Sequence, residues 1–181
     1  MELSSTAYVI LGMVSREARS GYEIKALVDG SVRFFWAASY GQIYPELKKL
    51  SEAGLVEGVD APTGDRKRTV YAITEAGEEA LKGWLREPPE TLEMREEGLL
   101  KLFFSGVLEP EEGAATLRAM RRQREQIGAQ LRAIEAEKGE IDDPYPPMVL
   151  RAGIEFNTWF ADWCERMEAQ LLAPQHERGS S

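Results

Sequence analysis

Residues 39–54 read SYGQIYPELKKLSEAG, which is the pattern of one amphipathic helix. Ser39 and Gln42 have the spacing of a capping box, in which each side chain accepts a hydrogen bond from the backbone N–H of the other residue. Apolar residues then recur at helical spacing, and a glycine follows where helices commonly end: Ile43, Leu47, Leu50 and Gly54. We therefore expect a helix that buries one side and exposes the other.

The exposed side of this helix has the composition of a surface that reads DNA. At 100° per residue, the face opposite the apolar residues carries a small residue, an amide able to pair with adenine, two cations and a phenol. These positions are Gly41, Gln42, Tyr44, Pro45, Lys48 and Lys49. Because Pro45 lacks an N–H, the sequence also predicts either a kink or a helix that becomes regular only after Tyr44.

Each of these side chains also has an ordinary structural interpretation. Lys48 and Lys49 are typical of a solvated helix face. Gln42 can be spent on its capping bond rather than on a base. Tyr40 and Tyr44 can pack at the edge of the core. The sequence leaves these alternatives open.

Two helices are expected before this one. Residues 5–14 are apolar almost all the way round, including Tyr8 and Leu11, so this helix must be covered on more than one side. Residues 20–23 read SGYE, a second capping-box pattern, and open a short helix that stops at Gly30.

A hairpin and a fourth helix are expected after it. Residues 55–59 and 68–73 are strand-like, and the turn-forming sequence APTGD at residues 61–65 separates them. Thr74 can cap a further helix that runs to Leu85. Three helices, a hairpin and a helix is the order of a winged helix-turn-helix, whose third helix enters the major groove.

The hairpin carries a run of cations, Arg66, Lys67 and Arg68. Phosphate contacts from such a wing would position the domain on DNA without reading its sequence, although a solubilising hairpin end has the same composition. Of the net charge of −9, residues 1–86 carry −1 and residues 87–181 carry −8. Since attraction to phosphate depends on local clusters of cations, the nearly neutral first half is compatible with DNA binding.

The second half predicts a helical arm. Two prolines at residues 88–89 mark a boundary, residues 94–107 predict a helix, and Pro110 suits the first turn of the next helix. That helix has a coiled-coil spacing interrupted by one arginine: Leu117, Met120, Arg124, Ile127, Leu131 and Ile134. Residues 142–147 interrupt the pattern. The last helix then carries one apolar stripe: Val149, Phe156, Phe160, Trp163, Met167 and Leu171.

The predicted fold class is mainly α with a small β-hairpin. We expect a DNA-binding winged helix-turn-helix domain over residues 1–87, a helical dimerisation domain over 88–173 and a disordered tail over 174–181. A single histidine and a single cysteine leave no catalytic triad, disulfide or zinc site, so neither an enzyme nor a cofactor or metal is expected. With no apolar run long enough to span a bilayer, we expect a cytoplasmic protein with no membrane partner.

Several motifs of the first half occur together in one family of regulators. They are SGYEI at residues 20–24, FW at 35–36, SYGQIYPEL at 39–47 and YAITEAG at 71–77. In this combination the sequence resembles the PadR-like transcriptional regulators over residues 3–86. In the second half, EE at 96–97 followed by LLKLFF at 99–104 resembles the longer helical C-terminal region of the virulence-activator-like branch.

The resemblance implies a dimeric regulator, usually a repressor, that binds double-stranded DNA and is often released by a small aromatic or amphipathic effector. As a homodimer it would bind a pseudo-palindromic operator. The residues expected to contact DNA are Tyr22, Tyr40, Gln42, Tyr44, Lys48, Lys49, Arg66, Lys67 and Arg68.

The resemblance also implies that the C-terminal helices of one chain pack against the first helix of its partner. The expected interface residues are Tyr8, Leu11, Phe156, Phe160, Trp163 and Met167, and a possible effector pocket near the junction of the two halves has Trp36, Trp159 and Trp163. Core packing is the alternative role of each aromatic side chain. The alternative to the function as a whole is a winged-helix adaptor that binds proteins, which would have no need of a basic hairpin.

Overall fold

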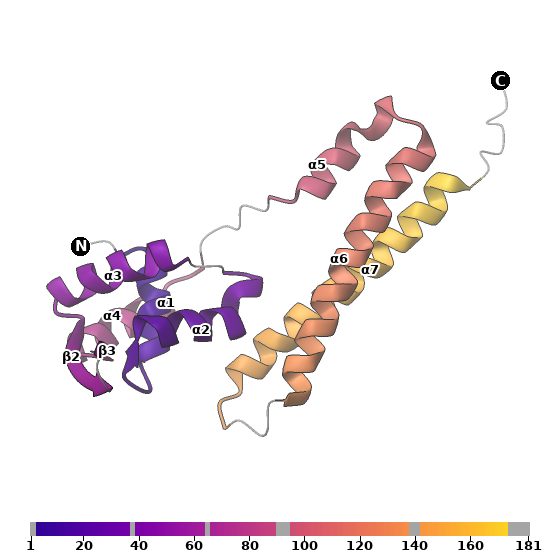
Figure 1. Ribbon diagram of the computed structural model, residues 1–181. Coiled ribbons are helices and arrows are strands. Elements are labelled where there is room, and N and C mark those ends of the chain that lie inside the picture. The colour runs from indigo at the N-terminus through magenta and orange to yellow at the C-terminus, as the bar shows by residue number, and fades with distance from the viewer. Residues whose placement is uncertain (1–2, 37–38, 64–65, 90–94, 138–141, 174–181) are drawn as a thin grey trace. The chain divides into compact units, whose positions relative to one another are not determined.

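The computed structural model describes residues 3–36, 39–63, 66–89, 95–137 and 142–173. The chain divides into two compact units, Met1–Thr91 and Leu92–Ser181 (Figure 1). Each unit has a hydrophobic core of its own. The tail predicted over residues 174–181 lies outside the described residues.

The helices of the first unit begin where the sequence predicts caps. They are α1 (Ser5–Val14), α2 (Gly21–Gly30), the short 3-10 helix η1 (Val32–Phe34), α3 (Tyr40–Glu52) and α4 (Glu75–Arg86). The capping boxes of Ser20 and Ser39 are both formed, and the Thr74 side chain accepts a hydrogen bond from the Gly77 N–H. Gly54 follows α3 with a φ of 70°, a conformation that glycine adopts readily. The predicted caps and helix end are confirmed.

A three-stranded antiparallel sheet completes the first unit. Its strands are β1 (Arg19–Ser20), β2 (Val56–Thr63) and β3 (Arg66–Ile73), in the order β1-β3-β2. Two expectations need correction, because β1 was not predicted and β2 extends into the predicted turn as far as Thr63. Pro62 is tolerated within β2 because this is an edge strand, where one side of the backbone needs no partner.

The core of the first unit lies among α1, α2, α3 and the start of β2. Its buried side chains are Ala7, Ile10, Leu11, Val14, Ile24, Val28, Ile43, Leu47, Leu50 and Val56. The partly buried Tyr8 stacks on Trp84 of α4, with ring centroids 4.7 Å apart. As predicted, α1 is covered on more than one side, and the order of elements is that of a winged helix-turn-helix.

Helix α3 accommodates its internal proline without a delayed start. The Ile43 N–H donates to the Ser39 carbonyl at 3.0 Å, so the first turn is closed before Pro45. The expectation that the helix becomes regular only after Tyr44 is therefore wrong. The capping box stabilises this first turn and offsets the hydrogen bond that Pro45 cannot donate.

The second unit is a helical hairpin with a short helix before it. Its elements are α5 (Glu97–Phe104), the 3-10 helix η2 (Ser105–Val107), α6 (Pro110–Glu137) and α7 (Tyr145–Leu172). Helices α6 and α7 run antiparallel, since Arg118 contacts Glu168 at 2.8 Å and Arg132 contacts Thr158 at 3.4 Å (Figure 1). The interruption expected over residues 142–147 ends earlier than predicted, because α7 already begins at Tyr145 and the prolines near its start fall in its first turn, where a missing N–H has no helical partner.

The core of the second unit is small. It consists of Leu117, Met120, Phe160 and Cys164. Arg124, the interruption in the predicted seam, forms an ion pair with Glu96 just before α5 and lies over the Phe160 ring, 4.5 Å from its centroid. The carboxylate and the ring compensate the arginine's charge among apolar neighbours.

Candidate nucleic-acid interface

Helix α3 has the two faces that the sequence predicts. Ile43, Leu47 and Leu50 are buried in the core. The opposite side is exposed at Gly41, Gln42, Tyr44, Pro45, Lys48 and Lys49. An exposed helix with a small residue, a phenol and two cations can lie in a major groove, because it offers close approach together with donors for base edges and phosphates.

Gln42 makes the capping bond. Its Oε1 accepts hydrogen bonds from the Ser39 N–H at 2.9 Å and from the Ser39 hydroxyl at 3.1 Å. Bidentate pairing with adenine requires both the oxygen and the nitrogen of an amide. Since the oxygen is already engaged, a base contact from Gln42 would have to use the amide nitrogen alone or break the cap.

Tyr44 connects α3 to the first turn of α2. A Cβ placed on Gly21 would lie 2.7 Å from Tyr44 Cε1, so the ring occupies the space that any side chain at Gly21 would need. The other side of the Tyr44 ring is accessible, since half of the residue is exposed. Tyr22 is also exposed, whereas the side chain of Tyr40 lies outside the described part of the chain.

Both lysines of α3 have carboxylate neighbours on the same helix. Lys49 Nζ lies 2.8 Å from Glu46 Oε1, and Lys48 Nζ lies 3.7 Å from Glu52 Oε1. The Lys48–Glu52 pair is exposed on both sides and contributes little to stability because solvent screens it, and in the other pair the lysine side chain is exposed. The lysines can therefore exchange these carboxylates for phosphates.

The predicted cationic run of the wing lies at the start of β3. Arg66 and Lys67 pair in register with Thr63 and Pro62 of β2, and their side chains lie outside the described part of the chain. Only Arg68 has a described side chain, and it forms an ion pair with Glu23 of α2. Of the predicted cationic run, the structure thus places one guanidinium, and it faces a carboxylate of the same unit.

Glu23 is held ionised by this contact. The hydrogen bond from Arg68, followed by that from the Ser20 N–H, lowers the pKa of Glu23 from 4.5 to about 2. The carboxylate accepts from the Ser20 N–H at 2.8 Å and from the Ser20 hydroxyl at 2.9 Å. One carboxylate therefore caps α2 and neutralises Arg68 at the same time.

The structure divides the predicted dimer residues into two groups. Leu11 and Phe160 are 0% and 4% exposed and belong to the cores of their own units, so neither offers accessible surface within its own chain. Phe156 is 44% exposed, and Tyr8, Trp163 and Met167 are partly buried. Trp159 is 54% exposed, so it is more accessible than any of the residues selected from the stripe.

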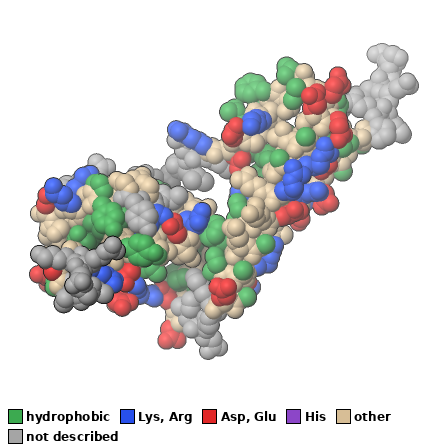
Figure 2. Space-filling view, viewed as in Figure 1, with side chains coloured by type: hydrophobic (Ala, Val, Ile, Leu, Met, Phe, Trp, Pro, Cys, Tyr) green, Lys and Arg blue, Asp and Glu red, His purple; other side chains and the backbone are tan. Residues whose placement is uncertain are grey.

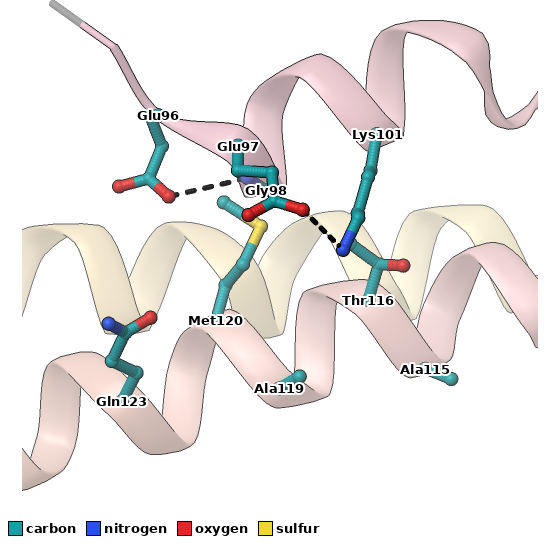
Figure 3. Close-up of a pocket in the computed structure, with 9 residues that line it drawn as sticks. All are labelled: Glu96, Glu97, Gly98, Lys101, Ala115, Thr116, Ala119, Met120 and Gln123. Carbon is teal, nitrogen blue, oxygen red and sulfur yellow. Dashed lines mark hydrogen bonds and ion pairs between the residues drawn. The ribbon is translucent and has the colours of Figure 1, made fainter.

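The proposed effector tryptophans belong to separate units. Trp36 follows η1 in the first unit, whereas Trp159 and Trp163 lie on α7 in the second. A cleft of about 520 Å³ lies instead within the second unit, between α5 and α6 (Figure 3). The ion pair of Glu97 and Lys101, 2.8 Å long, lies along it, and Met120 stands beside Gly98. No tryptophan is among its described lining residues.

The described residues form neither a membrane-spanning helix nor a metal-binding cluster. Among the described helices, none combines the length and the apolar composition needed to cross a membrane. Within those residues, no three His, Cys, Asp or Glu side chains are grouped so that they could hold a metal ion.

Comparison with known families explains both units. The model of the "Transcriptional regulator PadR-like family" matches residues 10–83, and that of "Virulence activator alpha C-term" matches residues 94–171. The chain belongs to the PadR-like family. The PadR-like proteins are transcriptional regulators, not enzymes, and the second match agrees with the branch predicted from the C-terminal half.

Relatives of this PadR-like chain span nearly its whole length. The negative transcriptional regulator PadR of Bacillus subtilis is 27% identical, over 91% of this chain and 96% of its own. Its crystal structure in complex with operator DNA has a TM-score of 0.86 at 26% identity and covers 93% of this chain and 99% of that one. Its complex with p-coumaric acid has a TM-score of 0.76 at 25% identity and covers 94% and 98%.

The ion pair of Glu23 with Arg68 in this PadR-like chain was not predicted from the sequence. The SGYE pattern explains the capping bond of Glu23, but Arg68 is far away in the sequence and was predicted to contact phosphate. The second capping box has Gln42 at the same position, and both residue types are usual there, so the capping pattern contains no signal for the contact with Arg68.

Proposed function

We propose that this PadR-like regulator binds double-stranded DNA, with α3 in the major groove and the β2–β3 hairpin at the phosphate backbone. The observation that carries the proposal is the exposed face of α3, which has Gly41 and the half-exposed Tyr44 in its first turns and Lys48 and Lys49 further along. The operator complex of Bacillus subtilis PadR supports it, since that chain shares the fold over almost its whole length. An adaptor that binds only proteins is not favoured.

The regulator works as a homodimer that represses transcription. Dimerisation is supported by the aromatic side chains that α7 leaves exposed, Phe156 and Trp159. Repression is supported by the description of the Bacillus subtilis relative as a negative transcriptional regulator. Two recognition helices on one duplex require a pseudo-palindromic operator with half-sites about one helical turn, or a multiple of it, apart.

Titration of DNA binding with salt tests the central proposal. Removing one phosphate contact lowers the slope of log K against log salt by about 1. We expect this decrease for Lys48→Ala and Arg66→Ala. Lys82→Ala, on α4, is the matched control and should leave the slope unchanged. If the natural protein shows no salt-dependent affinity for any duplex, the adaptor function replaces this one.

The regulator is released from DNA by a small aromatic or amphipathic molecule. The support is the p-coumaric acid complex of the relative together with the exposure of Trp36 and Trp159. A panel of phenolic acids and hydrophobic cations should quench tryptophan fluorescence saturably. Because coupling is reciprocal, DNA must weaken effector binding by the factor by which the effector weakens DNA binding, typically about 5- to 150-fold. A panel that produces neither effect would leave a regulator controlled by its own abundance.

A further inference from the structure

We infer that the ion pair of Arg68 and Glu23 is a strut that fixes the β2–β3 hairpin against the helix-turn-helix, so that Arg68 serves DNA binding by positioning the wing and not by touching phosphate. This inference rests on the proposed DNA binding. It reassigns a residue that the sequence placed at the DNA backbone.

The strut joins β3 to the start of α2. Arg68 lies on β3, two residues before Val70, which is the register partner of Ser20 in β1. The chain turns into α2 directly after Ser20, which brings Glu23 back to Arg68. Because β1 has only two residues, its ladder offers few hydrogen bonds, and the ion pair adds a side-chain link at the point where the ladder ends.

The carboxylate charge of Glu23 is not needed for capping. In the same unit, Gln42 fills the equivalent position of the α3 capping box through its amide oxygen. Capping boxes accept glutamine as well as glutamate because the oxygen is what the backbone N–H requires. The negative charge of Glu23 therefore serves the ion pair with Arg68, whereas Gln42 carries no charge and forms its cap without an ion pair.

The start of α2, which carries Glu23, also contacts α3, the helix proposed to enter the major groove. Gly21, two residues before Glu23, lies under the Tyr44 ring, and a Cβ there would also lie 3.3 Å from Leu47 Cδ1. The start of α2 is thus in contact with β3 on one side and with α3 on the other. A shift of the wing relative to α2 would change its distance from α3, and the two elements must fit one groove and its adjacent backbone together.

Charge and position predict opposite effects for one substitution. Glu23 puts a negative charge beside the proposed DNA surface, so electrostatics alone predicts that Glu23→Gln strengthens DNA binding. A strut predicts that the same substitution weakens it, because the cap is retained and the wing is released. Glu52→Gln is the matched control, since it removes a carboxylate that pairs with Lys48 of its own helix and not with Arg68.

The experiment measures the affinity of the full-length protein for a random-sequence duplex at low salt, with every variant shown to be folded by circular dichroism. We expect Glu23→Gln to weaken binding by about threefold or more and Glu52→Gln to strengthen it, a threefold change corresponding to about 0.7 kcal/mol. Glu23→Gln with Arg68→Gln should bind no more weakly than either single variant, since both remove one interaction. Stronger binding by Glu23→Gln, or additive losses in the double variant, would overturn the strut and make Arg68 a phosphate contact.

Amide hydrogen exchange tests the strut without DNA. Exchange at Val70 and Tyr71, the β3 residues paired with β1, should be faster in Glu23→Gln and unchanged in Glu52→Gln. If the natural protein binds no duplex, the proposed function fails and exchange alone decides the inference. Equal exchange in Glu23→Gln and the natural protein would overturn the strut.

Discussion

The two units differ in how completely they cover their own apolar side chains. The winged unit closes three helices and a sheet around a core in which the large side chains are fully buried. Among the described residues of the helical unit, only the small Ala114 and Cys164 are as deeply buried in its apolar core. Large apolar side chains remain accessible along α5, along α7, and in and just after η2: Leu100, Phe103, Phe104, Val107, Leu108, Tyr145, Met148, Val149, Phe156, Trp159, Leu171 and Leu172. Figure 2 shows hydrophobic side chains gathered at the end of this unit where α5 leads into α6.

This difference follows from the number of elements in each unit. In the helical unit one short helix, α5, covers part of the α6–α7 pair, whereas in the winged unit four helices and a sheet enclose the core from several sides. Extended apolar surface that remains exposed on one chain commonly marks a site of interaction with another molecule. The winged unit therefore has the core of a self-sufficient domain, whereas the helical unit leaves apolar surface that the proposed dimer would cover.

Phe160→Ala should have the largest effect. This buried ring is part of the core between α6 and α7, and removing such a ring typically costs about 3–5 kcal/mol. Denaturant unfolding followed by circular dichroism measures the loss, which should not depend on protein concentration. Phe156→Ala is the control, because its exposed ring should matter only through assembly and its effect should vary with concentration. Equal, concentration-independent losses would contradict the comparison of the two units.

Gly77→Ala should have the next largest effect, in the winged unit. A Cβ at Gly77 would lie 2.1 Å from the Leu55 carbonyl oxygen, which is a backbone atom and cannot rotate away. We expect a loss of about 3 kcal/mol, the upper end of the usual cost of overpacking. Gly83→Ala, on the same helix, meets no described atom within 4 Å and should instead stabilise by about 0.5–1 kcal/mol. Thermal unfolding of the two variants tests both signs.

Trp159→Ser tests whether the open side of the helical unit is an interface. Truncating a central aromatic residue of an interface typically costs about 2 kcal/mol or more, which is about 30-fold in the dissociation constant. Sedimentation equilibrium should show this shift toward monomer, with secondary structure retained. Gln170→Ser, an exposed polar position on α7, should leave assembly unchanged. A natural protein that is already a folded monomer at micromolar concentration would remove the case for a dimer.

The smallest expected effect is the change in the free energy of unfolding as the pH is lowered. With the pKa of Glu23 lowered from 4.5 to about 2, its ionised form stabilises the winged unit above about pH 4.5, and this contribution is lost as the pH falls toward 2. The free energy of unfolding of the natural protein should exceed that of Glu23→Gln at neutral pH, and the difference should shrink in this range. A difference that does not change with pH would show that the carboxylate charge is not what stabilises the fold.

Local patterns made much of the winged unit predictable. Both capping boxes, the Thr74 cap and the buried face of α3 depend on residues within one helix, so the sequence contains all the information needed. Strand β1 could not be predicted, because two residues have no periodicity and pair only when β3 is brought beside them. The ion pair of Arg68 and Glu23 depends on the same pairing and was missed for the same reason.

It was harder to predict which side chains of the apolar stripe on α7 are buried, because neighbouring aromatic residues cannot all face α6. The apolar spacing includes both Phe156 and Phe160, but only Phe160 is buried. The side chains that accompany it against α6 are the smaller Asn157, Ala161 and Cys164. Close approach of two helices selects small residues, and this rotates Phe156 outward. The rotation of α7 about its own axis depends on how α7 packs against α6. The spacing of apolar residues along α7 alone does not specify this rotation.

The capping bond of Gln42 has a consequence for how the regulator can acquire new target genes. A substitution at Gln42 changes the stability of the first turn of α3 together with any base contact, because its amide oxygen is bound to Ser39. Gly41 and Lys48 have no part in that cap, so mutations there can alter operator preference one step at a time. Divergence of binding specificity among descendants of this protein should therefore accumulate at Gly41 and Lys48 while Ser39 and Gln42 are retained together.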